Sequence, residues 1–261
     1  MKSLWLRLRP LLSTFVRYMH ISYLETRSRY EGTVLGILWI PVSTLSFSLL
    51  LGFVFRGSAT MTQVDFFLYV ICGYVTWNFI SDSIGGSTAI IQRRFDFAIH
   101  NNLSLLGLFG KVLADRGFEF GLDLLTVFLV FLVLAPSAYG PQMLLLVAFI
   151  PILAVTSLAV SYIVNLATLF YPDLANILST AVRLMLFATP IFWVVEERSG
   201  VRAVLEAYNP ASYYLMMMRQ IFGVQPVDAV SWLIGCGITL VLCSIGFIAY
   251  RRTSSFVRNL R

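Results

Sequence analysis

Ionisable side chains inside a long apolar stretch are the residues of this sequence with the clearest chemical meaning. Asp115, Glu119 and Asp123 follow one another at four-residue steps, so a helix would carry all three on one face. Charges at membrane depth face a bundle interior or a wet cavity and mark a transport path. The competing interpretation places Asp115 and Glu119 in the cytoplasmic headgroup layer. Asp123, the deepest of the three, is the carboxylate that we expect to face a channel.

Two arginines also fall inside apolar stretches. Arg116 can pair with Glu119 or with another helix. Arg183, which follows Asp173 in a later stretch, either snorkels to the membrane surface, pairs with an acid or faces the channel as a substrate contact.

Few residues could support catalysis by this chain alone. His20 and Glu25 resemble a spaced histidine and acid pair, which a membrane-embedded transferase could use as a general base, but a solvated or headgroup-facing His20 is the favoured interpretation. The sequence has no GxxxxGK[ST] motif, so it does not hydrolyse ATP by that route. We expect no catalytic site and no metal site. The cysteines lack CxxC spacing and are expected to pack inside apolar helices: Cys72, Cys236 and Cys243.

Apolar helices must position these residues. Hydrophobic residues make up 58% of the chain and charged residues 12%, whereas a soluble domain carries roughly 25% charged residues. The uncharged run from Val34 to Phe55 would make a helix of about 33 Å, enough to cross a hydrocarbon core of about 30 Å. The sequence therefore predicts an all-α integral membrane protein with one domain over 1–261. Its six predicted spans lie near 34–55, 66–88, 113–134, 143–169, 174–195 and 229–249.

Lysine and arginine positions predict the orientation, because cytoplasmic segments carry an excess of both. Most of the 19 basic residues lie in the head, in the loop after the second span and in the tail. Both termini are therefore expected in the cytoplasm. The residues that carry this bias are Lys2, Arg7, Arg9, Arg17, Arg27, Arg29, Arg93, Arg94, Lys111, Arg251, Arg252, Arg258 and Arg261.

The head is predicted to form an amphipathic helix over about residues 10–30. It has no short apolar core with a cleavage site, so we expect it to stay attached rather than act as a signal peptide. The helix either lies in the membrane interface with its apolar stripe toward lipid or packs on its own bundle. The stripe consists of Leu8, Leu12, Phe15, Val16, Met19 and Tyr23.

Two loops carry further short helices. The cytoplasmic segment 92–102 combines aromatic and charged residues, which suits docking into a groove of a soluble partner, although an interfacial helix without a partner has the same pattern. The segment 196–228 breaks at Asn209-Pro210, and its part 211–222 is too apolar for a solvated loop. We expect that part to dip into the membrane or to cap a vestibule on the outer side.

Several segments together resemble a known family. The segment 29–39, RYEGTVLGILW, resembles the start of the first span in type 2 ABC exporter permeases of the polysaccharide branch. Further similar pieces follow in the same order as in that family. One departure is Pro41, which follows Trp39 almost at once, whereas the family often has a proline a few residues later. The similar pieces are Tyr171-Pro172-Asp173, Thr189-Pro190-Ile191-Phe192, Asn209-Pro210 and Arg219.

The resemblance implies a homodimer in the bacterial inner membrane, joined to two copies of a separately encoded ATPase. That ATPase would hold ATP and Mg²⁺, while this chain would bind no cofactor and no nucleic acid. The implied cargo is a lipid-linked polysaccharide such as an O-antigen, capsule or teichoic acid chain. A drug or small-lipid exporter, and a membrane-embedded lipid-sugar transferase, are the alternatives.

The resemblance also gives roles to the short helices. The head would be an interface helix. Its end, at the approach to the first span, would carry Arg27, Arg29 and Tyr30. The segment 92–102 would be a coupling helix in the ATPase groove, with Arg93, Arg94, Phe95, Asp96, Phe97 and His100. The hairpin 196–222 would be a pair of external gate helices, with Asn209, Pro210, Tyr213, Tyr214 and Arg219.

A glycan channel needs walls that bind sugar weakly and repeatedly, and aromatic faces offer such contacts at low cost in side-chain entropy. Belts of aromatic residues at the membrane interfaces are the competing explanation for the same residues. The candidate channel aromatics are Trp39, Phe47, Tyr69, Tyr74 and Trp77.

Overall fold

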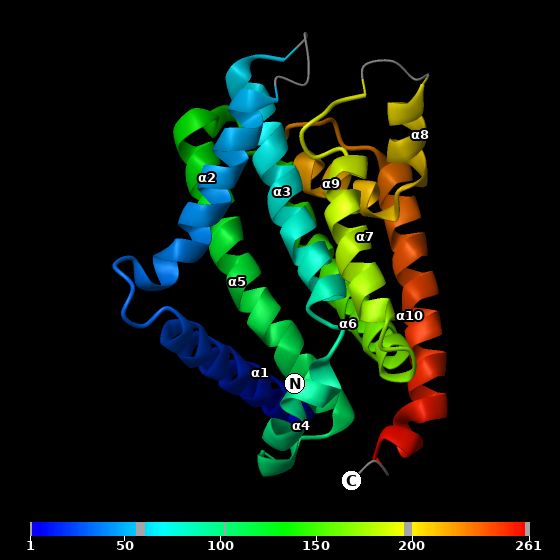
Figure 1. Cartoon of the computed structure of the whole chain (residues 1–261). Helices are drawn as coiled ribbons and strands as arrows, with labels where there is room; N and C mark the ends of the chain where they lie inside the picture. The colour runs from blue at the N-terminus through cyan, green and yellow to red at the C-terminus, as the bar shows by residue number, and fades with distance from the viewer. Residues whose placement is uncertain (1, 56–60, 102, 196–199, 259–261) are drawn as a thin grey trace.

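The chain folds into a bundle of long helices with short helices at both ends (Figure 1). The computed structural model describes residues 2–55, 61–101, 103–195 and 200–258, and side chains within these ranges from residue 13 to residue 253. The described residues contain no strand, so the predicted all-α membrane fold is confirmed. Five helices are long and apolar enough to cross a membrane: Gly36–Val54, Gln63–Gly85, Leu105–Leu134, Pro141–Phe170 and Ala229–Thr253.

The short helices divide between the two ends of the bundle. Helix α1 (Lys2–Arg29) lies across the lower end in Figure 1 and packs along α5, with α4 (Ile90–His100) beside it. The last turns of α10 (Ala229–Arg258) reach the same end. Helices α8 (Val201–Tyr208) and α9 (Pro210–Ile221) lie at the opposite end. The predicted head, coupling and outer-hairpin segments therefore all form helices, and the residues 196–199 of that hairpin lie outside the described part of the chain.

The first span begins later than predicted. Gly32 and Gly36 have φ angles of 82° and 56°, which glycine adopts without strain, and these turns keep 34–35 out of the helix. A short 3₁₀ turn, Gly36–Leu38, leads into helix α2 (Trp39–Val54). Pro41 therefore lies in the first turn of α2, where a missing N–H is tolerated, and it does not kink the span.

The second and third spans begin at capping residues. Helix α3 (Gln63–Gly85) follows Thr62, whose side chain accepts a hydrogen bond from the backbone N–H of Asp65. Helix α5 (Leu105–Leu134) follows Ser104, whose hydroxyl accepts from the N–H of Gly107. Helix α5 thus begins well before the predicted residue 113.

The predicted span 174–195 is only partly helical. Helix α7 (Leu174–Ala188) ends at Ala188 because Thr189 precedes a proline, and its ψ of 138° is extended. Its 15 residues extend about 22 Å, short of a hydrocarbon core of about 30 Å. The sequence reasoning was wrong in continuing this helix to residue 195.

The fourth and sixth spans agree more closely with the prediction. A 3₁₀ turn (Pro141–Leu145) leads into α6 (Leu146–Phe170), which packs against α10. At the start of α10, Asp228 accepts hydrogen bonds from the backbone N–H groups of Val230 and Ser231 at 3.1 and 3.0 Å. These bonds, together with one from the Ser231 hydroxyl, hold the pKa of Asp228 below its ordinary value.

Helix α3 is the centre of the bundle, since it contacts α2, α5, α6, α7 and α9. Its apolar residues lie in two core clusters, one shared with α5, α6 and α9 and the other with α2 and the segment after α7. Most of α3 is therefore buried by protein rather than exposed to lipid. The shorter helices α7 and α9 pack against it.

Arg219 of α9 holds together the end of this core that lies opposite α1. Its guanidinium is fully buried, donates from Nε to the backbone oxygen of Tyr69 at 3.2 Å and donates from Nη2 to the backbone oxygen of Pro190. The guanidinium carbon also lies 3.4 Å from the centre of the Tyr69 ring. Gly73 makes room for this cation, because a Cβ atom there would lie 2.6 Å from Nη2.

We expect Gly73→Ala to lower the free energy of unfolding by about 1–3 kcal/mol, because the added methyl group overpacks a site filled by a buried guanidinium. Thermal unfolding of the detergent-solubilised protein measures the change. Gly237→Ala is the control, since a Cβ at Gly237 meets nothing within 4 Å. An equal melting temperature for both variants would contradict this account of Gly73.

Candidate functional site

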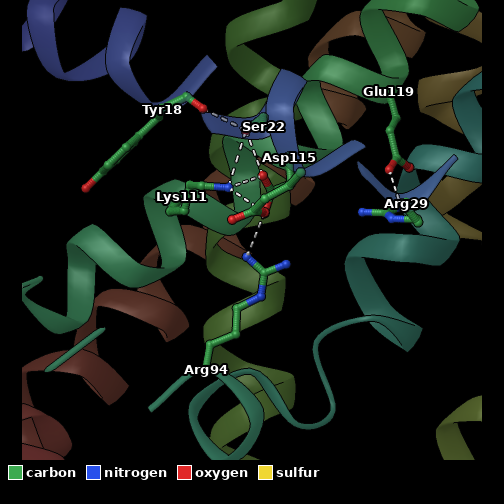
Figure 2. A network of polar contacts seen from close by, with 8 residues as sticks. Tyr18, Ser22, Arg29, Arg94, Lys111, Asp115 and Glu119 are labelled. Carbon is green, nitrogen blue, oxygen red and sulfur yellow. Dashed lines mark hydrogen bonds and ion pairs between the residues drawn. The ribbon is translucent and has the colours of Figure 1, made fainter. Parts of the chain in front are cut away.

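A network of charged residues connects three helices at the α1 end of the bundle (Figure 2). At its centre is Lys111 of α5, whose side chain is 0% exposed. Its ammonium contacts the carboxylate of Asp115 one turn later and lies 3.0 Å from Oε2 of Glu25 on α1. A buried ammonium is tolerated only when carboxylates and hydrogen bonds compensate for its lost hydration. The contact with Glu25 therefore fixes α1 on α5.

Asp115 joins the third helix to the other two. One of its oxygens faces Lys111 and accepts a hydrogen bond of 2.7 Å from the hydroxyl of Ser22 on α1. The other oxygen accepts from Nη1 of Arg94 on α4, also at 2.7 Å. One carboxylate thus connects α1, α4 and α5 (Figure 2).

Arg94 reaches Asp115 from an irregular point of α4. Its φ and ψ angles, −115° and 16°, depart from helical values and mark a kink. Arg93, Asp96 and His100 of the same helix are exposed, whereas Phe95 packs against the core cluster beneath it and Phe97 is half-buried. The six residues predicted to dock on a partner therefore separate into an exposed set and a set that anchors α4.

The approach to the first span is tied to α5 as well. Arg29 donates to Glu119 at 2.7 Å, in an ion pair that stays largely exposed. Asp115 and Glu119 are thus both paired with arginines, and Asp115 also with Lys111, while Arg27 remains exposed. Arg116 donates instead to hydroxyl groups, those of Ser161 on α6 and Ser87 after α3, at 2.6 and 2.8 Å.

Helix α1 has features of both predicted interpretations. Its Ser22 and Thr26 are buried against the bundle, whereas Phe15, Val16 and Tyr23 of the apolar stripe stay exposed. The side chains of Leu8 and Leu12 lie outside the described part of the chain. Helix α1 therefore packs on α5 by a small polar face and leaves an apolar face free.

A polar pocket of about 180 Å³ lies next to this network, between α2, α3 and α5. It contains Asp123, the carboxylate expected to face a channel. The residues that line it are Tyr30, Ile40, Ser43, Thr44, Asn78, Phe79, Asp82, Arg116, Glu119, Phe120 and Asp123.

The candidate channel aromatics divide by burial. Tyr69 and Trp77 are buried inside their own chain, and the Tyr69 hydroxyl donates to the backbone oxygen of Trp193. Phe47 stacks on Tyr74 with ring centres 4.7 Å apart, and Trp39 is exposed near the start of α2. Because they are buried, Tyr69 and Trp77 have a packing role in this structure. The accessible aromatic surface consists of Trp39, Phe47 and Tyr74. Arg183 is exposed on α7.

The outer hairpin is held by polar contacts of residues predicted for it. Asn209 accepts from the N–H of Ala211 at 3.0 Å and donates to the Thr189 hydroxyl at 2.7 Å, with Pro210 as the first residue of α9. Tyr214 hydrogen-bonds with Thr239 of α10 at 2.9 Å. The partly exposed Tyr213 donates to the backbone oxygen of Ala207. Most of α9 is buried, so its apolar sequence is explained by packing rather than by a solvated loop.

Comparison with known proteins gives this arrangement a family context. No family model matches the chain. An O-antigen export system permease protein RfbA of Myxococcus xanthus is 26% identical over 76% of this chain and 76% of its own length. Two proteins of the same name from Klebsiella pneumoniae are each 23% identical over 85% of this chain and 86% of their own length. These similarities support a type 2 ABC exporter permease.

Sequence reasoning missed the central pair of this charged network. Lys111 counted only as a cytoplasmic charge, and Asp115 as a possible headgroup residue, yet both are buried and paired. The available signal was their spacing, because a base and an acid four residues apart share one face of a helix. The partners Ser22 and Glu25 lie far away in the sequence, and nothing local indicates the contact.

We expect Asp115→Leu to lower the free energy of unfolding by about 3–5 kcal/mol, because it removes the carboxylate that compensates buried Lys111. Adding Lys111→Met should recover part of this loss, since the double variant leaves no buried ammonium there. Denaturant titration in mixed micelles measures both.

The more exposed pair between Arg29 of α1 and Glu119 of α5 provides the control for this experiment. Arg29→Gln breaks the contact with Glu119 and should cost at most about 1 kcal/mol. If the double variant were less stable than Asp115→Leu alone, Lys111 would not depend on Asp115 for its burial.

Proposed function

We propose that this chain is the membrane-spanning subunit of an ATP-driven exporter for a lipid-linked polysaccharide, of the O-antigen kind, in the bacterial inner membrane. The observation that carries the proposal is the similarity to O-antigen export permeases over most of the chain. In this proposal two copies form the channel, two copies of a separate ATPase bind ATP and Mg²⁺, and both termini are cytoplasmic.

The contacts of α4 support its role as the coupling helix. Its exposed side offers Arg93, Asp96 and His100 to a soluble partner. Its inner side is connected through Arg94 to Asp115, and through that carboxylate to Ser22 of α1. A displacement of α4 by the ATPase would therefore be passed to the span α5 and to the interface helix together, rather than being lost in a loose loop.

The accessible aromatic surface supports a glycan as cargo. Trp39 and the stacked pair of Phe47 and Tyr74 lie on α2 and on the adjoining part of α3. Aromatic faces bind the apolar faces of sugar rings with little loss of side-chain entropy. In the proposed homodimer this surface contributes to the wall of the channel.

A small lipid is the second candidate cargo, because the chain contains an apolar cavity of about 330 Å³. Its lining includes Ile80, Leu153, Val182, Met185 and Leu242, from α3, α6, α7 and α10. Such a cavity suits an acyl chain. Loss of surface glycan on deletion of the gene, with unchanged lipid composition of the outer leaflet, favours the polysaccharide, and the reverse pattern favours the lipid.

We expect Arg93→Glu to reduce glycan export and ATPase association by about tenfold. The reversed charge opposes docking at the exposed side of α4. Loss of a contact of a few kcal/mol lowers binding affinity by at least that factor. Co-purification with the partner ATPase measures its association, and blotting of the surface glycan measures export.

Arg252→Glu is the matched control, because it makes the same charge change at an exposed residue of α10 at the same end of the bundle. It should leave both readouts near those of the unchanged protein. If Arg93→Glu kept full export and full ATPase recovery, the docking role of α4 would be wrong. If deletion of the gene left surface glycan unchanged, the proposed function itself would be wrong.

A further inference from the structure

The polar pocket between α2, α3 and α5 contains an acceptor that the protein leaves without a donor. Asp123 is 7% exposed, and its Oδ1 atom has no hydrogen-bond partner. Thr44 of α2 lines the same pocket beside this carboxylate, and Oδ1 remains without a donor. A buried acceptor without a donor costs free energy, and at this position it borders a pocket of about 180 Å³.

The other lining groups indicate which kind of ligand would supply the missing donor. Asn78 and Ser43 can both donate and accept hydrogen bonds. Phe79 and Phe120 form an aromatic wall, with ring centres 5.0 Å apart and planes inclined by 59°. Carboxylate, amide, hydroxyl and aromatic face together fit a ligand that carries several hydroxyl groups around a compact apolar ring.

Charge argues against an anionic ligand. The lining contains three carboxylates, those of Asp82, Glu119 and Asp123, and one guanidinium, that of Arg116. The guanidinium is already engaged with Ser161 and Ser87. Glu119 is itself paired with Arg29, so a phosphate or pyrophosphate group would face the carboxylates of Asp82 and Asp123 with no free guanidinium in the lining to hold it. Nor does any group of three metal-ligating side chains converge among the described residues.

We propose that this pocket binds one neutral sugar ring of the exported glycan, with Asp123 accepting hydrogen bonds from ring hydroxyls. The proposal rests on the function proposed above and names the site at which the cargo is held. The pocket volume of about 180 Å³ is that of about six water molecules in the liquid, which is the scale of one monosaccharide unit.

The position of the pocket indicates when the sugar would bind. Tyr30 follows α1 directly and contributes to the lining, and Glu119 is held by Arg29 of α1. The pocket therefore adjoins the end of α1 at the side of the charged network. A glycan bound there lies next to the elements that the proposed coupling motion displaces, so its release can follow that motion.

Two substitutions of Asp123 test the proposal. Asp123→Asn keeps the shape and one acceptor, whereas Asp123→Leu keeps the branched skeleton and removes all hydrogen bonding. Asp65→Asn is the matched control, because it neutralises an exposed carboxylate at the far end of α3. The amount of each variant in the membrane is measured by immunoblotting, so that poor folding is recognised, and Asp123→Asn remains informative if Asp123→Leu does not insert.

The binding experiment uses the permease–ATPase complex in lipid nanodiscs. Saturation-transfer NMR is recorded with methyl α-mannopyranoside, methyl β-galactopyranoside and N-acetylglucosamine, and with glycerol and inorganic phosphate as competitors. We expect transfer to at least one glycoside, about tenfold weaker transfer with Asp123→Leu, and an intermediate value with Asp123→Asn. Surface-glycan export in cells should follow the same order, and Asp65→Asn should match the unchanged protein.

The outcomes separate the site from the function. If deletion of the gene abolishes export while Asp123→Asn and Asp123→Leu bind and export normally, the pocket proposal is wrong and the exporter stands. Displacement of the glycosides by phosphate would also overturn the pocket proposal, since it would show an anion site. Unchanged glycan export after deletion of the gene would overturn the function, and the pocket proposal with it.

Discussion

The buried ammonium of Lys111 is the constraint on which the α1 end of this structure depends. It cannot remain uncompensated in a low-dielectric interior, so Asp115 on its own helix and Glu25 on α1 must both stay close to it. Because Asp115 also accepts from Arg94, the position of α4 follows from the same requirement. A single charge on α5 therefore ties two peripheral helices to the bundle, in addition to the apolar core cluster that Ile90 and Ile91 of α4 share with α5.

The opposite end of the bundle depends on a second buried cation with a different environment. Arg219 has no carboxylate partner among the described residues and is held by backbone oxygens and by the ring of Tyr69. Carboxylates thus compensate the buried cation at one end, and backbone oxygens with an aromatic ring compensate the one at the other.

Much of the fold follows from hydropathy alone, because a bilayer demands long apolar helices and leaves few alternatives. The errors arose where a local rule overrides hydropathy. Positive φ angles at Gly32 and Gly36 delay α2, and Pro190 stops α7 at Ala188. At the candidate site, sequence spacing placed the acids of α5 on one face, but it could not show that Arg94 turns inward, since that contact joins residues brought together only by folding.

The burial of Arg219 has a consequence for biogenesis. Synthesis runs from the N-terminus, so α3 and its Tyr69 carbonyl enter the bilayer long before Arg219 leaves the ribosome. Until then the cavity beside Gly73 has no occupant, and the segment around Pro190 lacks the donor that holds it. The contacts of Arg219 with Tyr69 and Pro190 therefore form late in synthesis, and a chain truncated before α9 would lack them.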